Sequence, residues 1–70
     1  MDEKELLLKM NFEREALCDD IRTKMEDKRL TQRKICEDLG FYPQNLNAFL
    51  NGRAKLSFKK VKMITEYLEM

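Results

Sequence analysis

The segment that most constrains the fold is residues 31 to 52, which read TQRKICEDLGFYPQNLNAFLNG. Two short runs with apolar residues at helical spacing stand on either side of a lone glycine, Gly40. The apolar pairs are Ile35 with Leu39 and Leu46 with Phe49. Glycine adopts a positive φ at little cost, so Gly40 permits a sharp turn between two helices. Pro43 then suits the first position of the second helix, because proline lacks an N–H and has a fixed φ.

The expected helix starts share a second pattern, in which an apolar residue before each N-cap has an apolar partner five positions later. The pairs are Leu30/Ile35, Phe41/Leu46 and Leu56/Val61, around N-caps at Thr31, Tyr42 and Ser57. Each pair fits a hydrophobic staple. Thr31 and Ser57 are good capping residues, whereas Tyr42 is not. The sequence therefore predicts a helix-turn-helix over residues 31 to 52.

This segment resembles the DNA-binding domain of the lambda-repressor/Cro (XRE) family. The matching residues are Leu30, Thr31 and Gln32, the small Cys36, Gly40 with Phe41, Leu46 and Phe49, and the closing Asn51, Gly52 and Arg53. The resemblance covers roughly residues 21 to 68, and the first twenty residues have no clear counterpart in the family. It implies an all-α, five-helix domain that binds duplex DNA.

The resemblance also implies which residues meet the DNA. The helix of residues 43 to 51 would lie in the major groove, where Gln, Asn and small apolar side chains can contact base edges. The family's base-reading positions fall on Pro43, Gln44, Asn45, Asn47 and Ala48, with Tyr42 as a further contact. Gln32 matches a glutamine that meets a phosphate and buttresses the reading helix, and Asn51, Arg53 and Lys55 match a loop that contacts the backbone. Pro43 and Ala48 stand where many members carry longer polar side chains, which predicts few direct base contacts.

The charge distribution favours the same interpretation. Residues 28 to 62 hold nine basic and two acidic side chains, a net charge of +7, whereas the rest of the chain holds five basic and eleven acidic ones. Arg33, Lys34, Lys59 and Lys60 fall in first turns of helices, where a cation opposes the helix dipole. A bound phosphate would reverse that penalty. A solvated surface of mixed charge is the alternative explanation.

Composition excludes several other classes of function. The chain has 70 residues, 39% of them charged, with no histidine and only Cys18 and Cys36 as thiols. We therefore expect no metal site, no cofactor and no enzyme activity, and we interpret both cysteines as small core residues. No secretory apolar region and no run of about 20 apolar residues is present, so the sequence predicts a cytoplasmic protein without a membrane span.

Outside the motif, the sequence predicts two amphipathic helices, over residues 12 to 28 and residues 57 to 69. The opening segment, residues 1 to 11, is treated as an N-terminal extension of a single domain spanning residues 1 to 70. Its apolar residues Leu6, Leu7, Leu8 and Met10 are too many for one core stripe. The segment either continues the next helix or folds back, and Asn11 with the charged run after it favours a break near residue 11.

Together these patterns predict a sequence-specific DNA-binding protein, a repressor of transcription that binds as a homodimer. The alternative is an antitoxin-type or other protein-interaction module that uses residues 2 to 10 for its partner and binds DNA secondarily. The two differ in whether residues 2 to 10 pack on their own domain or stay free.

Overall fold

The computed structural model describes all 70 residues and contains five α-helices and no strands. The helices are α1 (Glu3–Phe12), α2 (Arg14–Asp27), α3 (Gln32–Leu39), α4 (Pro43–Leu50) and α5 (Phe58–Tyr67). The predicted all-α, five-helix fold is confirmed. The helices expected over residues 12 to 28, 43 to 51 and 57 to 69 are each present with ends one or two residues shorter.

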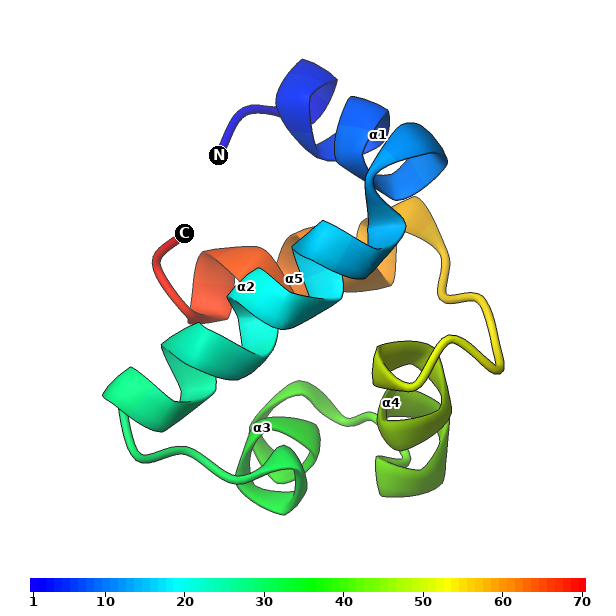
Figure 1. Ribbon diagram of the computed structural model, residues 1–70. Coiled ribbons are helices and arrows are strands. Elements are labelled where there is room, and N and C mark those ends of the chain that lie inside the picture. Colours follow the sequence, from blue (N-terminus) through cyan, green and yellow to red (C-terminus); the bar gives the residue numbers. More distant parts are fainter.

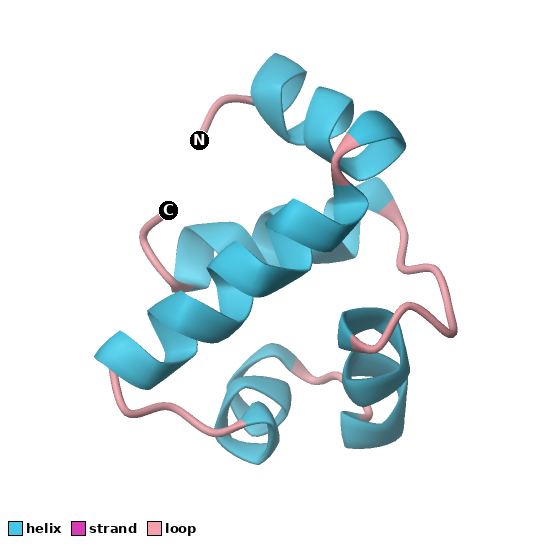
Figure 2. Ribbon diagram, viewed as in Figure 1, coloured by secondary structure: helices cyan, strands magenta, loops and turns pink.

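The helices form two groups around α2 and α5, which cross the middle of the molecule (Figures 1 and 2). At one end, α1 packs on both α2 and α5. At the other end, α3 packs on α4 and α5, while α4 also packs on α2. The N-terminal ammonium of Met1 donates a hydrogen bond to a main-chain oxygen of Met70, so the two termini lie together.

One cluster of thirteen buried side chains connects all five helices. Its members are Leu6, Leu17, Cys18, Ile21, Met25, Ile35, Cys36, Leu46, Phe49, Leu50, Val61, Ile64 and Leu68. Both cysteines are free thiols within it, as the sequence predicts. Burial raises the pKa of both thiols, because removal from water disfavours the thiolate.

The N-terminal segment forms a helix of its own, and the break expected near residue 11 lies at Glu13. In a continuous helix Leu6 would lie about 16 Å along the axis from Leu17. The break instead turns α1 back, so that Leu6 is almost completely buried against the core. Leu7 and Leu8 remain half exposed at 50% and 57%. The opening segment therefore folds back, but only part of its apolar surface is used in doing so.

Four helices end in the same local structure, with a positive φ at the residue that follows the last turn. These residues are Arg29 (φ 54°), Gly40 (φ 77°), Gly52 (φ 76°) and Glu69 (φ 58°). In each case the next N–H donates to the carbonyl five residues earlier, as from Phe41 to Cys36 at 2.9 Å. This is the Schellman arrangement, which satisfies carbonyls that the helix leaves unpaired. Two of the four positions are not glycine and so adopt a conformation that costs an L-residue energy.

Candidate nucleic-acid interface

The turn between α3 and α4 consists of three residues, Gly40, Phe41 and Tyr42. Thr31 caps the start of α3, where its hydroxyl accepts from the Lys34 N–H at 3.1 Å. Phe41 packs against the core, whereas Tyr42 is 67% exposed and gives α4 no side-chain cap. The predicted pair of helices joined by a sharp turn at Gly40 is therefore present.

Helix α4 has one apolar and one polar face. Leu46, Phe49 and Leu50 enter the core, and the expected reading residues Pro43, Gln44, Asn45 and Asn47 are exposed. Ala48 is only partly exposed. The accessible face of α4 thus presents three uncharged amide side chains that combine hydrogen-bond donors with acceptors.

A stripe of three hydrogen-bond donors on α2 holds the C-terminal end of α4. Arg14, Cys18 and Arg22 lie at four-residue intervals and so on one face of the helix. Arg14 donates to the Ala54 carbonyl, the Cys18 thiol donates to the Phe49 carbonyl at 3.6 Å, and Arg22 donates to the Leu50 carbonyl at 2.8 Å. The Phe49 and Leu50 carbonyls belong to the last turn of α4 and the Ala54 carbonyl to the loop after it, and cations near the end of a helix stabilise the negative end of its dipole.

Sequence reasoning missed this donor stripe, although its spacing was visible in residues 14 to 22. The sequence alone indicates only a packing role for Cys18, and Arg14 and Arg22 fall in the part of the chain with a net negative charge. The expected buttress, Gln32, is partly buried, and no hydrogen bond joins its amide to α4. The support of α4 comes from α2 instead.

The Arg22 guanidinium also begins a chain of side-chain hydrogen bonds to the exposed face of α4. The same Nη2 that contacts Leu50 donates to Asn51 Oδ1 at 2.8 Å. Asn51 Nδ2 in turn donates to Asn47 Oδ1 at 3.3 Å. Asn51, expected at the backbone-contacting loop, therefore lies between α2 and a predicted base-reading residue.

The basic side chains of residues 28 to 62 divide into paired and unpaired groups. Arg33 and Lys34 in the first turn of α3 pair with Glu37 and Asp38 at 3.4 and 3.2 Å. Lys28 pairs with Glu69, and Lys62 pairs with Glu3 and Glu66. The remaining five form no ion pair: Arg29, Arg53, Lys55, Lys59 and Lys60. Four of these five lie between residues 53 and 60, directly after α4, so the unneutralised positive charge is concentrated there.

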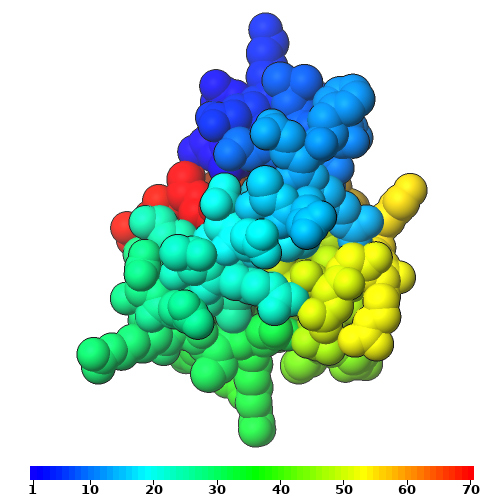
Figure 3. Space-filling view, viewed as in Figure 1, coloured from blue at the N-terminus to red at the C-terminus, as the bar shows by residue number.

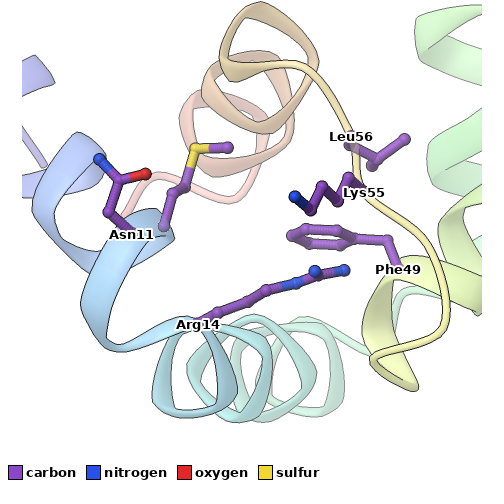
Figure 4. Close-up of a pocket in the computed structure, with 6 residues that line it drawn as sticks. Asn11, Arg14, Phe49, Lys55 and Leu56 are labelled. Atoms are coloured by element: carbon purple, nitrogen blue, oxygen red, sulfur yellow. The ribbon is translucent and has the colours of Figure 1, made fainter.

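Lys55 lies beside a surface pocket of about 340 Å³ between the α1–α2 junction and the loop after α4. Figure 4 shows the Lys55 side chain and the Arg14 guanidinium on opposite sides of the Phe49 ring. The guanidinium lies 4.9 Å from the ring centroid, a cation–π contact. Arg53 and Lys55 are both exposed on this loop, and of the two only Lys55 lines the pocket.

A hydrogen bond between Tyr67 and Asp38 links α5 to α3. The Tyr67 hydroxyl donates to Asp38 Oδ2, and this hydrogen bond, with that from Lys34, lowers the pKa of the Asp38 carboxyl. The same hydrogen bond raises the pKa of the Tyr67 phenol, because the donor must keep its proton. The structure contains no group of three or more metal-ligating side chains, and none of its helices has the length and apolar character needed to cross a membrane.

Comparisons with known proteins identify no relative: no family model matches the chain, and no significant match was found among curated proteins or among solved structures.

Proposed function

We propose that this protein binds duplex DNA in a sequence-specific manner and regulates transcription, as a repressor that occupies an operator. The observation that carries the proposal is the exposed amide face of α4, bordered on its C-terminal side by cations that have no ion-pair partner. Uncharged amides read base edges, whereas unpaired Lys and Arg attract phosphates. The eight residues of α4 span about 12 Å, a length that fits across the major groove.

In this arrangement the loop after α4 would contact the phosphate backbone through Arg53 and Lys55, and the first turn of α3 would do so through Arg33. Arg33 is 84% exposed, and its pair with Glu37 is a surface pair of small net energy. A phosphate at the α3 N-terminus would therefore replace that carboxylate at little cost, helped by the helix dipole. Gln44, Asn45 and Asn47 would supply the base contacts, with Tyr42, Pro43 and Ala48 as apolar contacts.

The experiment is selection of bound sequences from a random duplex library by the full chain, followed by affinity measurements over a range of salt concentrations. We expect an enriched motif and an affinity that falls steeply with salt. Gln44→Ala should lose preference at one A·T position, by about 1–3 kcal/mol, and keep its non-specific affinity, since glutamine pairs bidentately with adenine. Failure of the wild-type chain to bind any duplex at low salt would contradict the proposal.

Homodimerisation is part of the proposal, because two half-sites give a domain with few base contacts useful specificity. A symmetric enriched motif, with half-sites about one helical turn apart, is the expected signature. A single asymmetric site bound by one chain would show that the protein acts as a monomer.

A second candidate function, a protein-interaction module, is favoured by one specific observation. Helix α1 leaves Leu7, Leu8 and Phe12 exposed, with Phe12 at 80%. Figure 3 shows α1 (blue) at the end of the molecule remote from α3 (green). A partner docked on α1 would therefore leave the DNA-binding surface free. Retention of a specific partner protein by the wild type, and loss of that partner in a Leu8→Gln/Phe12→Gln variant, would support this function.

A further inference from the structure

The hydrogen bonds from Arg22 to Asn51 to Asn47 have only one possible direction. A guanidinium has donors and no acceptor, so Arg22 can meet only the carbonyl oxygen of the Asn51 amide. That orientation turns Asn51 Nδ2 toward Asn47, and an NH₂ group can meet only the Asn47 oxygen. The cation on α2 thus sets the orientation of two successive amides.

The second of these oriented amides belongs to Asn47, which is exposed on α4. Its Oδ1 already accepts a hydrogen bond at 3.3 Å, whereas its Nδ2 has no partner within the protein. Asparagine reads adenine with both ends of the amide, accepting from N6 and donating to N7. Because Asn51 engages Oδ1, Nδ2 is the free end of the Asn47 amide, and it can donate to an acceptor that guanine, thymine and adenine present in the major groove and cytosine does not.

We propose that Arg22, acting through Asn51, orients Asn47 as a hydrogen-bond donor, so that this position of α4 accepts bases with an acceptor in the major groove and discriminates against cytosine, which presents only a donor there. The inference rests on the proposed function, and it assigns Arg22 as a positioning residue that does not itself touch the DNA. Gln44 and Asn45 form no side-chain hydrogen bonds within the protein and stay free to turn either end toward a base. The three amides of α4 therefore differ in what they can read.

The first experiment identifies the base pair whose preference depends on Asn47. In a panel of duplexes that carry the selected motif with single base-pair changes, Asn47→Ala identifies the position whose preference depends on Asn47. Wild-type protein should disfavour cytosine there, on the contacted strand, relative to the three bases that present an acceptor. The expected ratio is roughly three- to tenfold, the range of one net hydrogen bond.

The second experiment removes Arg22 and Asn51 in turn from the hydrogen-bonded chain that ends at Asn47. Arg22→Ala and Asn51→Ala should each reduce the discrimination against cytosine at this position to less than about twofold, since Asn47 can then reverse its amide and accept from cytosine N4. Preferences at the other positions should remain. Arg22→Lys keeps a cation that can donate to Asn51 Oδ1 and should retain most of the preference.

Arg14→Ala is the matched control. Arg14 belongs to the same donor stripe and also donates to a carbonyl after α4, but it makes no contact with Asn51. This variant should lower stability and leave the base preference unchanged. If Arg22→Ala fails to fold, as judged by circular dichroism, Asn51→Ala and Arg22→Lys decide the comparison.

An unchanged preference in both Arg22→Ala and Asn51→Ala would overturn the inference, as would a wild-type preference for cytosine on the contacted strand at the Asn47-dependent position. Either result leaves the proposed function standing, because the protein still selects a motif. Absence of any selected motif overturns the proposed function itself.

Discussion

The Arg14 guanidinium lies against the Phe49 ring, 4.9 Å from its centroid, and donates a hydrogen bond to the Ala54 carbonyl. One side chain of α2 thus contacts both the last turn of α4 and the loop after it. Arg14 Nε is buried without a partner, which reduces the net gain.

Removal of the guanidinium should therefore loosen the attachment of α4. In Arg14→Met, which keeps an apolar stem, we expect the free energy of unfolding in urea to fall by about 1–2 kcal/mol, from one cation–π contact and one hydrogen bond. Lys24→Met, on the same helix, removes a cation without an ion pair and should change it by less than about 0.5 kcal/mol. Equal effects of the two substitutions would show that Arg14 contributes only as a surface charge.

The helix ends offer a stabilising substitution. Arg29 has a φ of 54°, a conformation that costs an L-residue about 1–2 kcal/mol and glycine much less. Arg29→Gly should raise the free energy of unfolding by about 0.5–1 kcal/mol after the greater freedom of glycine in the unfolded chain is included. Gly40→Ala should lower it by about 1 kcal/mol, because the added Cβ meets no atom within 4 Å and only the backbone cost remains. Thermal and urea denaturation both measure these changes.

The loop after α4 should account for about two phosphate contacts. Changing Arg53 and Lys55 together to alanine should weaken binding to specific and random duplexes alike, and reduce the slope of log affinity against log salt by about two contacts. The control is Lys4→Ala with Lys24→Ala, which removes one positive charge from α1 and one from a part of α2 that lines a pocket with Glu69 and Met70. A slope that stays at the wild-type value would exclude both residues from the phosphate contacts. A reduction by one contact would fit the position of Lys55 beside Phe49.

Substitutions at the exposed positions of α1 test whether two chains associate through this helix, without disturbing the core. Deletion of residues 1 to 10 would remove the buried Leu6 together with the exposed side chains, and so confuse folding with association. Leu8→Gln with Phe12→Gln changes only exposed positions, at 57% and 80%. If two chains associate through this surface, at roughly 1.5–3 kcal/mol for each fully buried side chain, sedimentation equilibrium should show a dimer that becomes monomeric in the variant. An unchanged mass in a folded variant would place the dimer contact elsewhere.

The hydrogen bond from Tyr67 to Asp38 predicts a pH dependence with a definite sign. The folded pKa of Asp38 lies below its ordinary value, so its contribution to stability is present above about pH 4 and is lost as pH falls through the lowered pKa. The raised pKa of Tyr67 works in the opposite direction, since its contribution is present below about pH 10 and is lost as pH rises through the raised pKa. Tyr67→Phe should return the Asp38 pKa toward its ordinary value in a carboxyl NMR titration. Lys34→Ala should do so to a smaller extent, and no change in Tyr67→Phe would contradict the assigned cause.

Local sequence was sufficient to predict most of the secondary structure. Thr31 and Ser57 cap the helices where the sequence places them, and Gly40 has the positive φ that its position requires. Caps and turns depend on contacts between residues three to five apart, so the necessary chemistry is contained in a short window. Local sequence does not predict the positive φ of Arg29 and Glu69, because neither residue type favours that conformation.

The tertiary structure decided what depends on distant contacts. The sequence shows three consecutive leucines in α1, but only the fold determines that Leu6 is buried and Leu8 is not, because the break at Glu13 sets which face of α1 meets α2 and α5. The hydrogen bond from Arg22 to Asn51 joins residues 29 positions apart, and Asn51 in turn donates to Asn47. The sequence by itself determined the approximate bounds of α2 to α5 and which amides α4 exposes. Only the tertiary structure decides how the Asn51 and Asn47 amides are oriented and which cations lack an ion-pair partner. Both depend on contacts between side chains that folding brings together.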